Sequence, residues 1–176
     1  MTTPVSLSRA EILRLFDALN AELAKSDTRG ELYLVGGAVM CLALGARDTT
    51  RDVDGLFRPA AAVRSAAVRV AEREGLSPGW LNDAVKGFLS ARGSSDPFLE
   101  LTHLAVFVAQ PTYLLAMKCV AMRLGEEFQD LDDVRYLLRY LNITSPAAAL
   151  AIVLEYFEAT AIPAKTRLAL EEMLGD

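Results

Sequence analysis

The stretch LYLVGGAVMCLALGARDTTRDVDGLF, residues 32–57, decides the fold. An apolar run at residues 32–35 stops at two glycines, and a second apolar segment follows at residues 38–44. A polar connection then leads to Asp-Val-Asp at residues 52–54 and to two more apolar residues after the next glycine. Glycine interrupts strands and helices because it adopts backbone conformations that other residues avoid. The pattern predicts a strand, a glycine turn, a short helix, a loop and a second strand.

Asp52 and Asp54 carry the chemistry of this stretch. Residues two apart on a strand share a face, so both carboxylates are expected to project to one side and Val53 to the other. Two neighbouring carboxylates repel each other unless a cation lies between them, and oxygen ligands of this kind suit Mg²⁺. The nearby glycine turn offers backbone N–H groups and a helix N-terminus to a phosphate. Together these features indicate metal-dependent chemistry on a nucleoside triphosphate.

Size and composition limit the alternatives. The chain has 176 residues, 52% of them hydrophobic and 23% charged, which is typical of a compact protein with one domain, or one domain and a helical appendage. The net charge of -5 excludes a bulk nucleic-acid binder, so an RNA or DNA partner would need a local basic patch or metal ions. The one histidine, His103, excludes a multi-histidine metal site, and we interpret it as a strand residue without a catalytic part.

The cysteines and the apolar runs bear on location. Cys41 and Cys119 lie far apart in apolar segments, which predicts buried free thiols in a reducing compartment. No apolar run approaches the roughly 20 residues that span a bilayer, and the polar start MTTPVSLSRAE shows no targeting signal. We therefore expect a cytoplasmic protein with no membrane partner.

The order of the remaining elements predicts the fold class. Ser8 and Glu11 fit a capping box at the start of a first helix. A helix is expected from Pro59 to about Glu74, closed by a glycine, and residues 98–108 read as one or two strands. Residues 80–89 fit either a short strand or one helical turn, and only helices are expected after Pro111. Helix, then mixed strands and helices, then helices predicts an α+β fold with a small sheet and a C-terminal helical bundle.

The order and spacing of these motifs resemble a known superfamily. The sequence VGG, a spacer and then T-x-D-V-D is similar to the core motif of the polymerase-β-like nucleotidyltransferases. The later PTYLLAMKCVAMRL and DLDDVRYL resemble motifs of its AbiE-type toxin branch and related uncharacterised members. The resemblance implies a nucleotidyltransferase-like core at residues 1–110 and a helical region at residues 111–176. It also implies that Gly36 and Gly37 hold the triphosphate while Asp52 and Asp54 bind two metal ions, Mg²⁺ or Mn²⁺.

A third carboxylate belongs to the same resemblance, and the sequence leaves its position open. Asp83, in WLNDAVKG, follows the helix that starts near Pro59 and lies beside apolar residues, which makes it the first choice. Glu100, in FLELTHL, alternates more cleanly with apolar neighbours and competes with it. Thr50, two residues before Asp52, has a hydroxyl that would anchor the loop or a phosphate.

Other charged residues have both a structural and a functional interpretation. Lys118 lies inside a long apolar helix. The structural interpretation is a lysine at the helix edge whose ammonium reaches water. The resemblance implies instead that Lys118 contacts phosphate. Asp130 and Asp133 start a helix, where acids stabilise the helix dipole; the resemblance implies that they also position Lys118 or the nucleotide. Three arginines surround the Asp-Val-Asp motif and would balance the acids or contact phosphates: Arg47, Arg51 and Arg58.

Two functions of different classes follow. The first is a nucleotidyltransferase that moves an NMP from an NTP to an acceptor hydroxyl, with Asp52, Asp54 and Asp83 as catalytic residues. By resemblance, the acceptor would be RNA such as a tRNA 3′ end, and the protein would be the toxin of a toxin–antitoxin pair, with an antitoxin partner. The second is a catalytically degenerate member of the same fold that acts as a nucleotide-binding or protein-interaction module.

Overall fold

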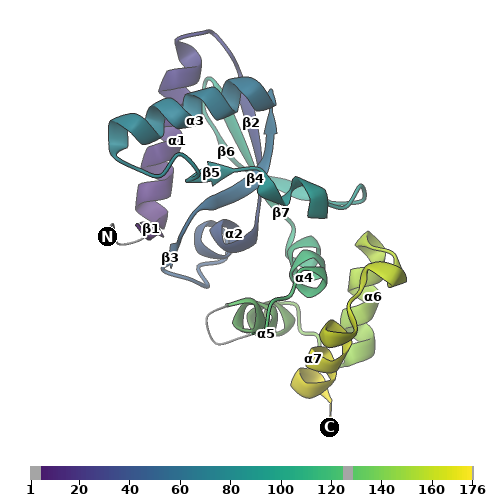
Figure 1. The fold of residues 1–176 in the computed structure, drawn as a ribbon. Helices are drawn as coiled ribbons and strands as arrows, with labels where there is room; N and C mark the ends of the chain where they lie inside the picture. Colours follow the sequence, from purple (N-terminus) through teal and green to yellow (C-terminus); the bar gives the residue numbers. More distant parts are fainter. Residues whose placement is uncertain (1–4, 125–128, 176) are drawn as a thin grey trace. The chain divides into compact units, whose positions relative to one another are not determined.

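The computed structural model describes residues 5–124 and 129–175, and within them the chain is an α+β protein. Seven α-helices and two short 3-10 helices accompany seven strands in these residues, arranged as a mixed sheet of five strands and a small sheet of two (Figure 1). The α+β class expected from the sequence is confirmed. The chain divides into two compact units, the first made of Met1–Gly87 and Ser95–Ala109 and the second of Phe88–Ser94 and Gln110–Asp176.

The first unit contains the five-stranded sheet. Its strands lie in the order β5 (Leu81–Asn82), β4 (Val53–Arg58), β2 (Gly30–Val35), β7 (Leu104–Ala109) and β6 (Ser95–Glu100). β2 is antiparallel to β4 and parallel to β7, while β5 is parallel to β4 and β6 is antiparallel to β7. The strand that carries Asp54 therefore lies directly beside the strand that ends at the glycine turn.

Two helices cover one face of this sheet, α1 (Arg9–Ala24) and α3 (Ala60–Glu74) (Figure 1). The predicted capping box is present: the Ser8 hydroxyl accepts from the Glu11 N–H, and the Glu11 carboxylate accepts from the Ser8 N–H. Gly75, at φ 69°, closes α3 as expected. Burying the apolar faces of both helices against the sheet is the main stabilising term of this unit. Fully buried members of this core are Ile12, Phe16, Leu19, Leu32, Leu34, Val53, Val63, Val70 and Leu104.

An ionic cluster joins the two helices at their edge. Glu22 of α1 is buried, and its carboxylate contacts Lys25 at 2.8 Å, Arg69 at 3.0 Å and Arg73 at 2.8 Å. Hydrogen bonds from Lys25 and Arg69 outweigh the effect of burial and lower the pKa of Glu22 from 4.5 to about 2. The acid is therefore held ionised between α1 and α3.

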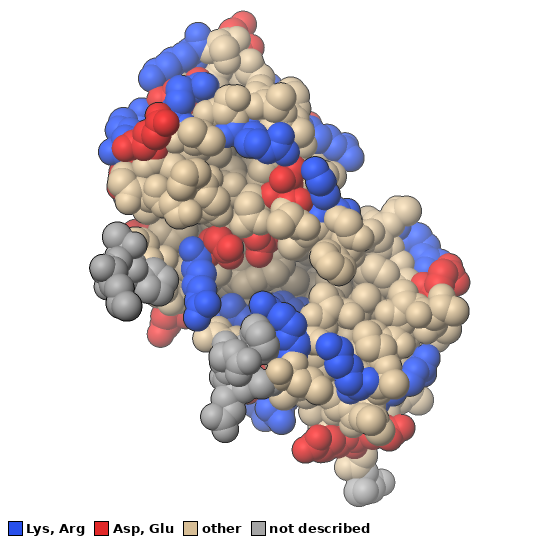
Figure 2. Space-filling view, in the orientation of Figure 1, with Lys and Arg blue, Asp and Glu red and all other residues tan. Residues whose placement is uncertain are grey.

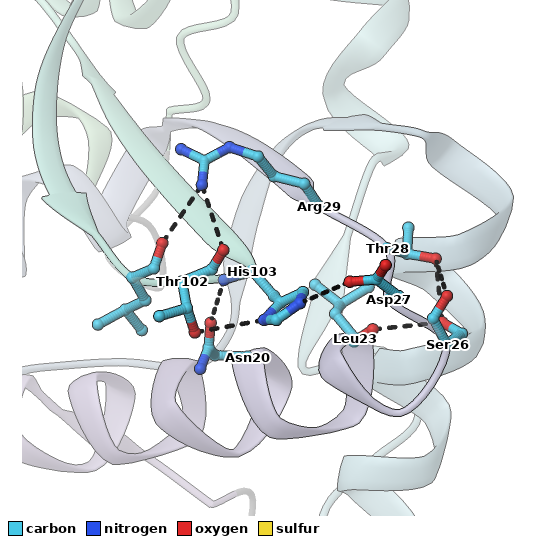
Figure 3. A network of polar contacts seen from close by, with 9 residues as sticks. Asn20, Leu23, Ser26, Asp27, Thr28, Arg29, Thr102 and His103 are labelled. Carbon is cyan, nitrogen blue, oxygen red and sulfur yellow. Dashed lines mark hydrogen bonds and ion pairs between the residues drawn. The ribbon is translucent and has the colours of Figure 1, made fainter.

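A polar network ties the end of α1 to the turn between β6 and β7 (Figure 3). The His103 N–H donates to Asn20 Oδ1 at 2.7 Å, and His103 Nε2 lies 3.2 Å from Asp27 Oδ1. Arg29 reaches the carbonyls of Leu101 and Thr102 from the start of β2. The expectation that His103 is a strand residue is wrong, because it lies in this turn just before β7. Its N–H donates to the Asn20 side chain of α1, and its carbonyl accepts from the Gly30 N–H at the first residue of β2 at 2.9 Å.

The region of residues 32–57 forms the predicted succession of elements. β2 runs into α2 (Gly36–Leu42), and a loop leads to β3 (Thr49–Thr50), which pairs with β1 (Leu7–Ser8) before β4 begins. Asp52 immediately precedes β4 and is not part of it. Residues 80–89 contain both of the alternatives, the short strand β5 and a 3-10 helix, Ala84–Phe88.

The second unit is helical. Its helices are α4 (Pro111–Val120), α5 (Asp130–Tyr140), α6 (Pro146–Tyr156) and α7 (Ala164–Leu174). α4 packs against α5 and α6, and α6 packs against α7. α4 ends earlier than the apolar pattern suggested. Beyond the end of the helix at Val120, the Arg123 N–H donates to the Asp130 carboxylate at 3.0 Å.

Segment Phe88–Ser94 joins the second unit although it lies between two strands in the sequence. The Ser90 N–H donates to the Tyr113 hydroxyl at 3.0 Å, and the Ser90 hydroxyl donates to the Tyr156 carbonyl. Gly93 packs so closely on the Tyr113 ring that a Cβ at this position would overlap it. These contacts fix the segment on α4 and α6.

The cysteines are buried free thiols, as expected. Burial raises the pKa of Cys119 to about 12 and also raises that of Cys41. Neither thiol is therefore prepared to act as a nucleophile. Across residues 5–124 and 129–175, no helix has both the length and the apolar character to cross a membrane.

Candidate functional site

The glycine turn and the Asp54 carboxylate lie side by side. Gly36 follows β2 at φ +70°, a left-handed conformation that favours glycine, and lets the chain turn directly into α2. A Cβ at Gly36 would lie 3.5 Å from Asp54 Oδ2. The pairing of Val35 with Asp54 across β2 and β4 explains this proximity. The strand end, the turn and the acid thus form one local structure.

Gly37 is needed because two polar side chains pack against it. A Cβ there would lie 2.6 Å from Arg47 Nη1 and 3.0 Å from Thr50 Oγ1, so a larger residue would displace the guanidinium and the hydroxyl. Thr50 is buried, and its hydroxyl donates to the Asp52 carbonyl at 3.2 Å. Of the two roles considered for Thr50, this hydrogen bond provides the anchor for the loop. Arg47 is the arginine that these contacts bring to the glycine turn.

Asp52 immediately precedes β4 and Asp54 is its second residue, with the alternation of burial expected from the sequence. Val53 between them is fully buried, whereas both acids are partly exposed. The Val53 N–H donates to the Trp80 carbonyl at 2.7 Å, which fixes the strand entry. Because Val53 points into the core, the neighbouring carboxylates project from the opposite face.

Neither acid expected as third carboxylate is the residue aligned with this pair. The parallel pairing of β4 and β5 places Asn82 beside Asp54, and Asn82 Nδ2 lies 3.4 Å from Asp52 Oδ2. Asp83, one residue further, contacts Arg64 of α3 at 2.6 Å and Lys86 at 3.7 Å. Burial opposes its ionisation, but the contacts with Arg64 and Lys86 prevail and lower the pKa of Asp83.

Glu100 lies far from Asp54 in the sheet. It is on β6, the opposite edge strand, with β2 and β7 between β6 and β4. Its carboxylate contacts Arg29 at 3.0 Å, and its side chain is 79% exposed. Glu100 therefore belongs to the surface at the other edge of the sheet.

The three arginines of the motif have different surroundings. Arg47 contacts the glycine turn, as described above. Arg58 lies over the ring of Tyr33, 5.1 Å from its centroid, and that ring stacks on Phe107 at 4.8 Å. Arg51 is exposed in the bend before Asp52. Basic and acidic side chains are interspersed over the face in Figure 2, so a cation at the site would act locally and not as part of a large basic surface.

Lys118, Asp130 and Asp133 form one buried ionic cluster in the second unit. Lys118 Nζ lies 2.7 Å from Asp133 Oδ2 and 3.6 Å from Asp130 Oδ1, and all three side chains are at most 12% exposed. Arg123 contacts Asp130 at 2.8 Å from the far side. The acids therefore position Lys118, which is one of the roles that the resemblance implied for them.

The pKa of Asp130 reflects this cluster. Burial alone would raise it, but hydrogen bonds from the Arg123 side chain and backbone, together with the charge of Lys118, lower it below its ordinary value. The acid is thus stabilised in its charged form. A buried cluster of this kind links α4 to α5, because Lys118 lies on the first helix and the acids on the second.

The residues beside Gly36 offer only part of the ligand set that a divalent cation needs. In the described part of the chain, no group of three or more His, Cys, Asp or Glu side chains is placed to hold a metal ion. Two carboxylates, Asp52 and Asp54, are nevertheless sufficient for Mg²⁺ when phosphate oxygens and water supply the other ligands. These two acids alone are therefore not a complete metal site, and a cation bound there would need further ligands such as phosphate oxygens and water.

Comparisons with protein-family models, curated proteins and solved structures found no match. Sequence reasoning missed Asn82, which contacts Asp52. The dipeptide Leu-Asn beside the expected Asp83 gave no signal, because a strand of two residues has no periodicity to read.

Proposed function

We propose that this chain is a metal-dependent nucleotidyltransferase, which moves an NMP from an NTP to an acceptor hydroxyl. The observation that carries the proposal is the proximity of Asp54 to the glycine turn, with a Cβ position at Gly36 only 3.5 Å from its carboxylate. A phosphate that approaches this turn would meet a metal held by Asp52 and Asp54. The same succession of strand, turn, helix and acid pair underlies the resemblance to the polymerase-β-like superfamily.

Each residue then has a defined task. Asp52 and Asp54 hold the Mg²⁺ or Mn²⁺ ions, and Gly36 and Gly37 keep the turn free of side chains so that a phosphate can approach the backbone. Arg47, whose guanidinium packs on Gly37, supplies positive charge to the triphosphate. Thr50 fixes the loop that carries Asp52. Lys118 contributes structurally, because its contacts with Asp130 and Asp133 link α4 to α5.

The reaction is an in-line displacement. The acceptor oxygen attacks the α-phosphorus, the bond from that phosphorus to the bridging oxygen breaks, pyrophosphate leaves, and the hydroxyl proton passes to water. Mg²⁺ or Mn²⁺ held by Asp52 and Asp54 would supply activation of the attacking oxygen and charge neutralisation of the leaving group. The chain's own residues contribute positioning and charge, which is what phosphoryl transfer chiefly requires.

The acceptor we propose is RNA, such as a tRNA 3′ end, in a protein that acts as the toxin of a toxin–antitoxin pair. The support is the resemblance of PTYLLAMKCVAMRL and DLDDVRYL to the AbiE-type branch. Arg51 is exposed next to Asp52 and is suited to contact the acceptor backbone.

The direct test uses purified protein with each of the four labelled NTPs, Mg²⁺ and total RNA. Wild type is expected to transfer label to RNA, and Asp52→Ala and Asp54→Asn are expected to lose transfer. Glu72→Gln, an exposed acid of α3, is the matched control and should behave as wild type. Equal transfer by wild type and Asp52→Ala would refute the assignment of the site.

A degenerate nucleotide-binding or protein-interaction module is the second candidate. It is favoured by one observation, that the residue aligned with Asp54 on β5 is an amide, Asn82. Calorimetry with ATP, GTP, CTP and UTP in the presence of Mg²⁺ separates the candidates. Binding without transfer would support a nucleotide-binding module, and the absence of both binding and a thermal shift would support a role in protein interaction.

A further inference from the structure

The amide of Asn82 has a fixed orientation. Its Nδ2 donates to the Gly79 carbonyl at 3.2 Å, and its Oδ1 accepts from the Ala84 N–H at 3.3 Å. The two backbone partners differ in kind, one an acceptor and one a donor, so they distinguish the nitrogen of the amide from its oxygen. The turn before β5 and the start of the 3-10 helix after it therefore hold this side chain between them.

This orientation decides what Asn82 offers to the acid pair. With Oδ1 occupied by the Ala84 N–H, the group that faces Asp52 is the Nδ2 donor, 3.4 Å from Asp52 Oδ2. An N–H group donates to a carboxylate but does not bind a metal cation. Asn82 thus restrains one oxygen of Asp52 and adds no negative charge.

We propose that Asn82 is the positioning residue for Asp52 and makes metal binding at this site depend on the nucleotide. This inference rests on the proposed function for its ligand, an NTP with a divalent cation. With two carboxylates instead of three, the site attracts a free divalent cation only weakly, because affinity for such ions rises with the number of charged ligands. The triphosphate supplies the missing negative charge, so metal and nucleotide bind together.

The register of β4 and β5 allows the proposal to be tested by changing one side chain, Asn82. Asn82 and Asp54 are aligned on adjacent parallel strands, so their side chains share a face of the sheet. An aspartate at position 82 would place a third carboxylate on that face. Asp83 does not take this role, because its carboxylate is held by Arg64 at 2.6 Å.

The test measures binding of Mn²⁺ by electron paramagnetic resonance, with and without a non-hydrolysable ATP analogue. Wild type should bind Mn²⁺ weakly alone and about tenfold or more tightly with the analogue, in the range by which neighbours of metal ligands tune affinity. Asn82→Asp should bind Mn²⁺ alone about tenfold more tightly than wild type and depend less on the analogue. Asn82→Ala should not gain affinity for Mn²⁺ alone.

Two controls test whether the effect of Asn82→Asp comes from the position of the new carboxylate or only from its added charge. Ala84→Asp adds the same charge at an exposed position two residues along and should leave Mn²⁺ affinity near that of wild type. Asn82→Asp combined with Asp54→Asn should lose the gain. Circular dichroism and thermal unfolding establish that each variant is folded before its affinity is compared.

The proposal is overturned if folded Asn82→Asp binds Mn²⁺ no better than wild type, or if Ala84→Asp gains as much. It is also overturned if wild type binds Mn²⁺ equally well with and without the analogue. These outcomes are distinct from failure of the proposed function. If wild type transfers no nucleotide while Asn82→Asp still gains affinity through Asp54, the position of Asn82 stands and the enzymatic activity does not.

Discussion

Two acid pairs in this protein are built from the same residue type and lie in different surroundings. Asp130 and Asp133 are buried on α5 and contact Lys118 and Arg123. Asp52 and Asp54 are partly exposed at the start of β4, beside a glycine turn and an amide. A buried acid must have cations within the fold, because an unpaired charge is too costly there. The second pair is partly exposed and is therefore accessible to a cation from solution, as the proposed function requires.

The largest effect is expected from a change at the partly exposed pair, Asp52 and Asp54. It should reduce nucleotide transfer without reducing stability. Asp54→Asn keeps the size of the side chain and removes a proposed metal ligand, so label transfer to RNA should fall about a thousandfold, as when a major electrostatic contribution to a transition state is lost. The melting temperature should stay close to that of wild type, because the acid is partly exposed and asparagine has the same size. A large drop in melting temperature with little change in label transfer would show that Asp54 has a structural role and would contradict this prediction.

The buried pair should show the opposite behaviour. Asp133→Asn leaves the Lys118 ammonium without its 2.7 Å partner, and the free energy of unfolding should fall by about 3 kcal/mol, as when one member of a buried ion pair is removed. Urea unfolding measures the change.

A double-mutant cycle makes this prediction specific to the pair. Lys118→Met with Asp133→Asn should cost less than the sum of the single changes, because no uncompensated charge remains. Additive losses would show that Lys118 and Asp133 do not act on each other.

A third acid, Glu22, is buried and paired like Asp130 and Asp133, and its contribution to stability should depend on pH. Its pKa is about 2 in the folded protein and 4.5 in the unfolded reference, so its contribution is complete above pH 4.5 and is lost as the pH falls toward 2. Denaturant unfolding of wild type and Glu22→Gln across this range should show a stability difference that is largest near neutral pH and mostly gone at pH 2. Because other acids titrate equally in both proteins, the difference isolates Glu22. A difference that grows on acidification would contradict the assignment.

The smallest effect is expected in the polar network between α1 and the turn before β7 (Figure 3). Asn20→Ala removes the acceptor of the His103 N–H and should cost about 1 kcal/mol, the usual scale of one hydrogen bond. Asp27→Asn, at a side chain 98% exposed, should change stability by less than about 0.5 kcal/mol. Thermal unfolding compares the two variants, and equal losses would show that exposure does not set the scale here.

Much of the fold followed from local patterns. The capping box of Ser8 and Glu11, the glycine after α3 and the proline that begins α4 are short-range signals, and the structure has each of them. His103 was misjudged because the apolar pattern of residues 98–108 fitted one or two strands and did not locate a turn, whereas β6 and β7 are two strands with a turn at this residue. Periodicity reports which residues are buried and not where a hairpin reverses.

The sequence by itself determined the elements and the candidate acids, because glycine turns, alternation and helix caps depend on neighbours along the chain. Only the tertiary structure decided which residue stands beside Asp54. Asn82 is 28 positions away along the printed sequence, counting 82 minus 54, and it reaches the acid through the pairing of two strands. The same holds for Lys118, whose partners lie on another helix. Contacts between elements depend on register and packing, which no local pattern encodes.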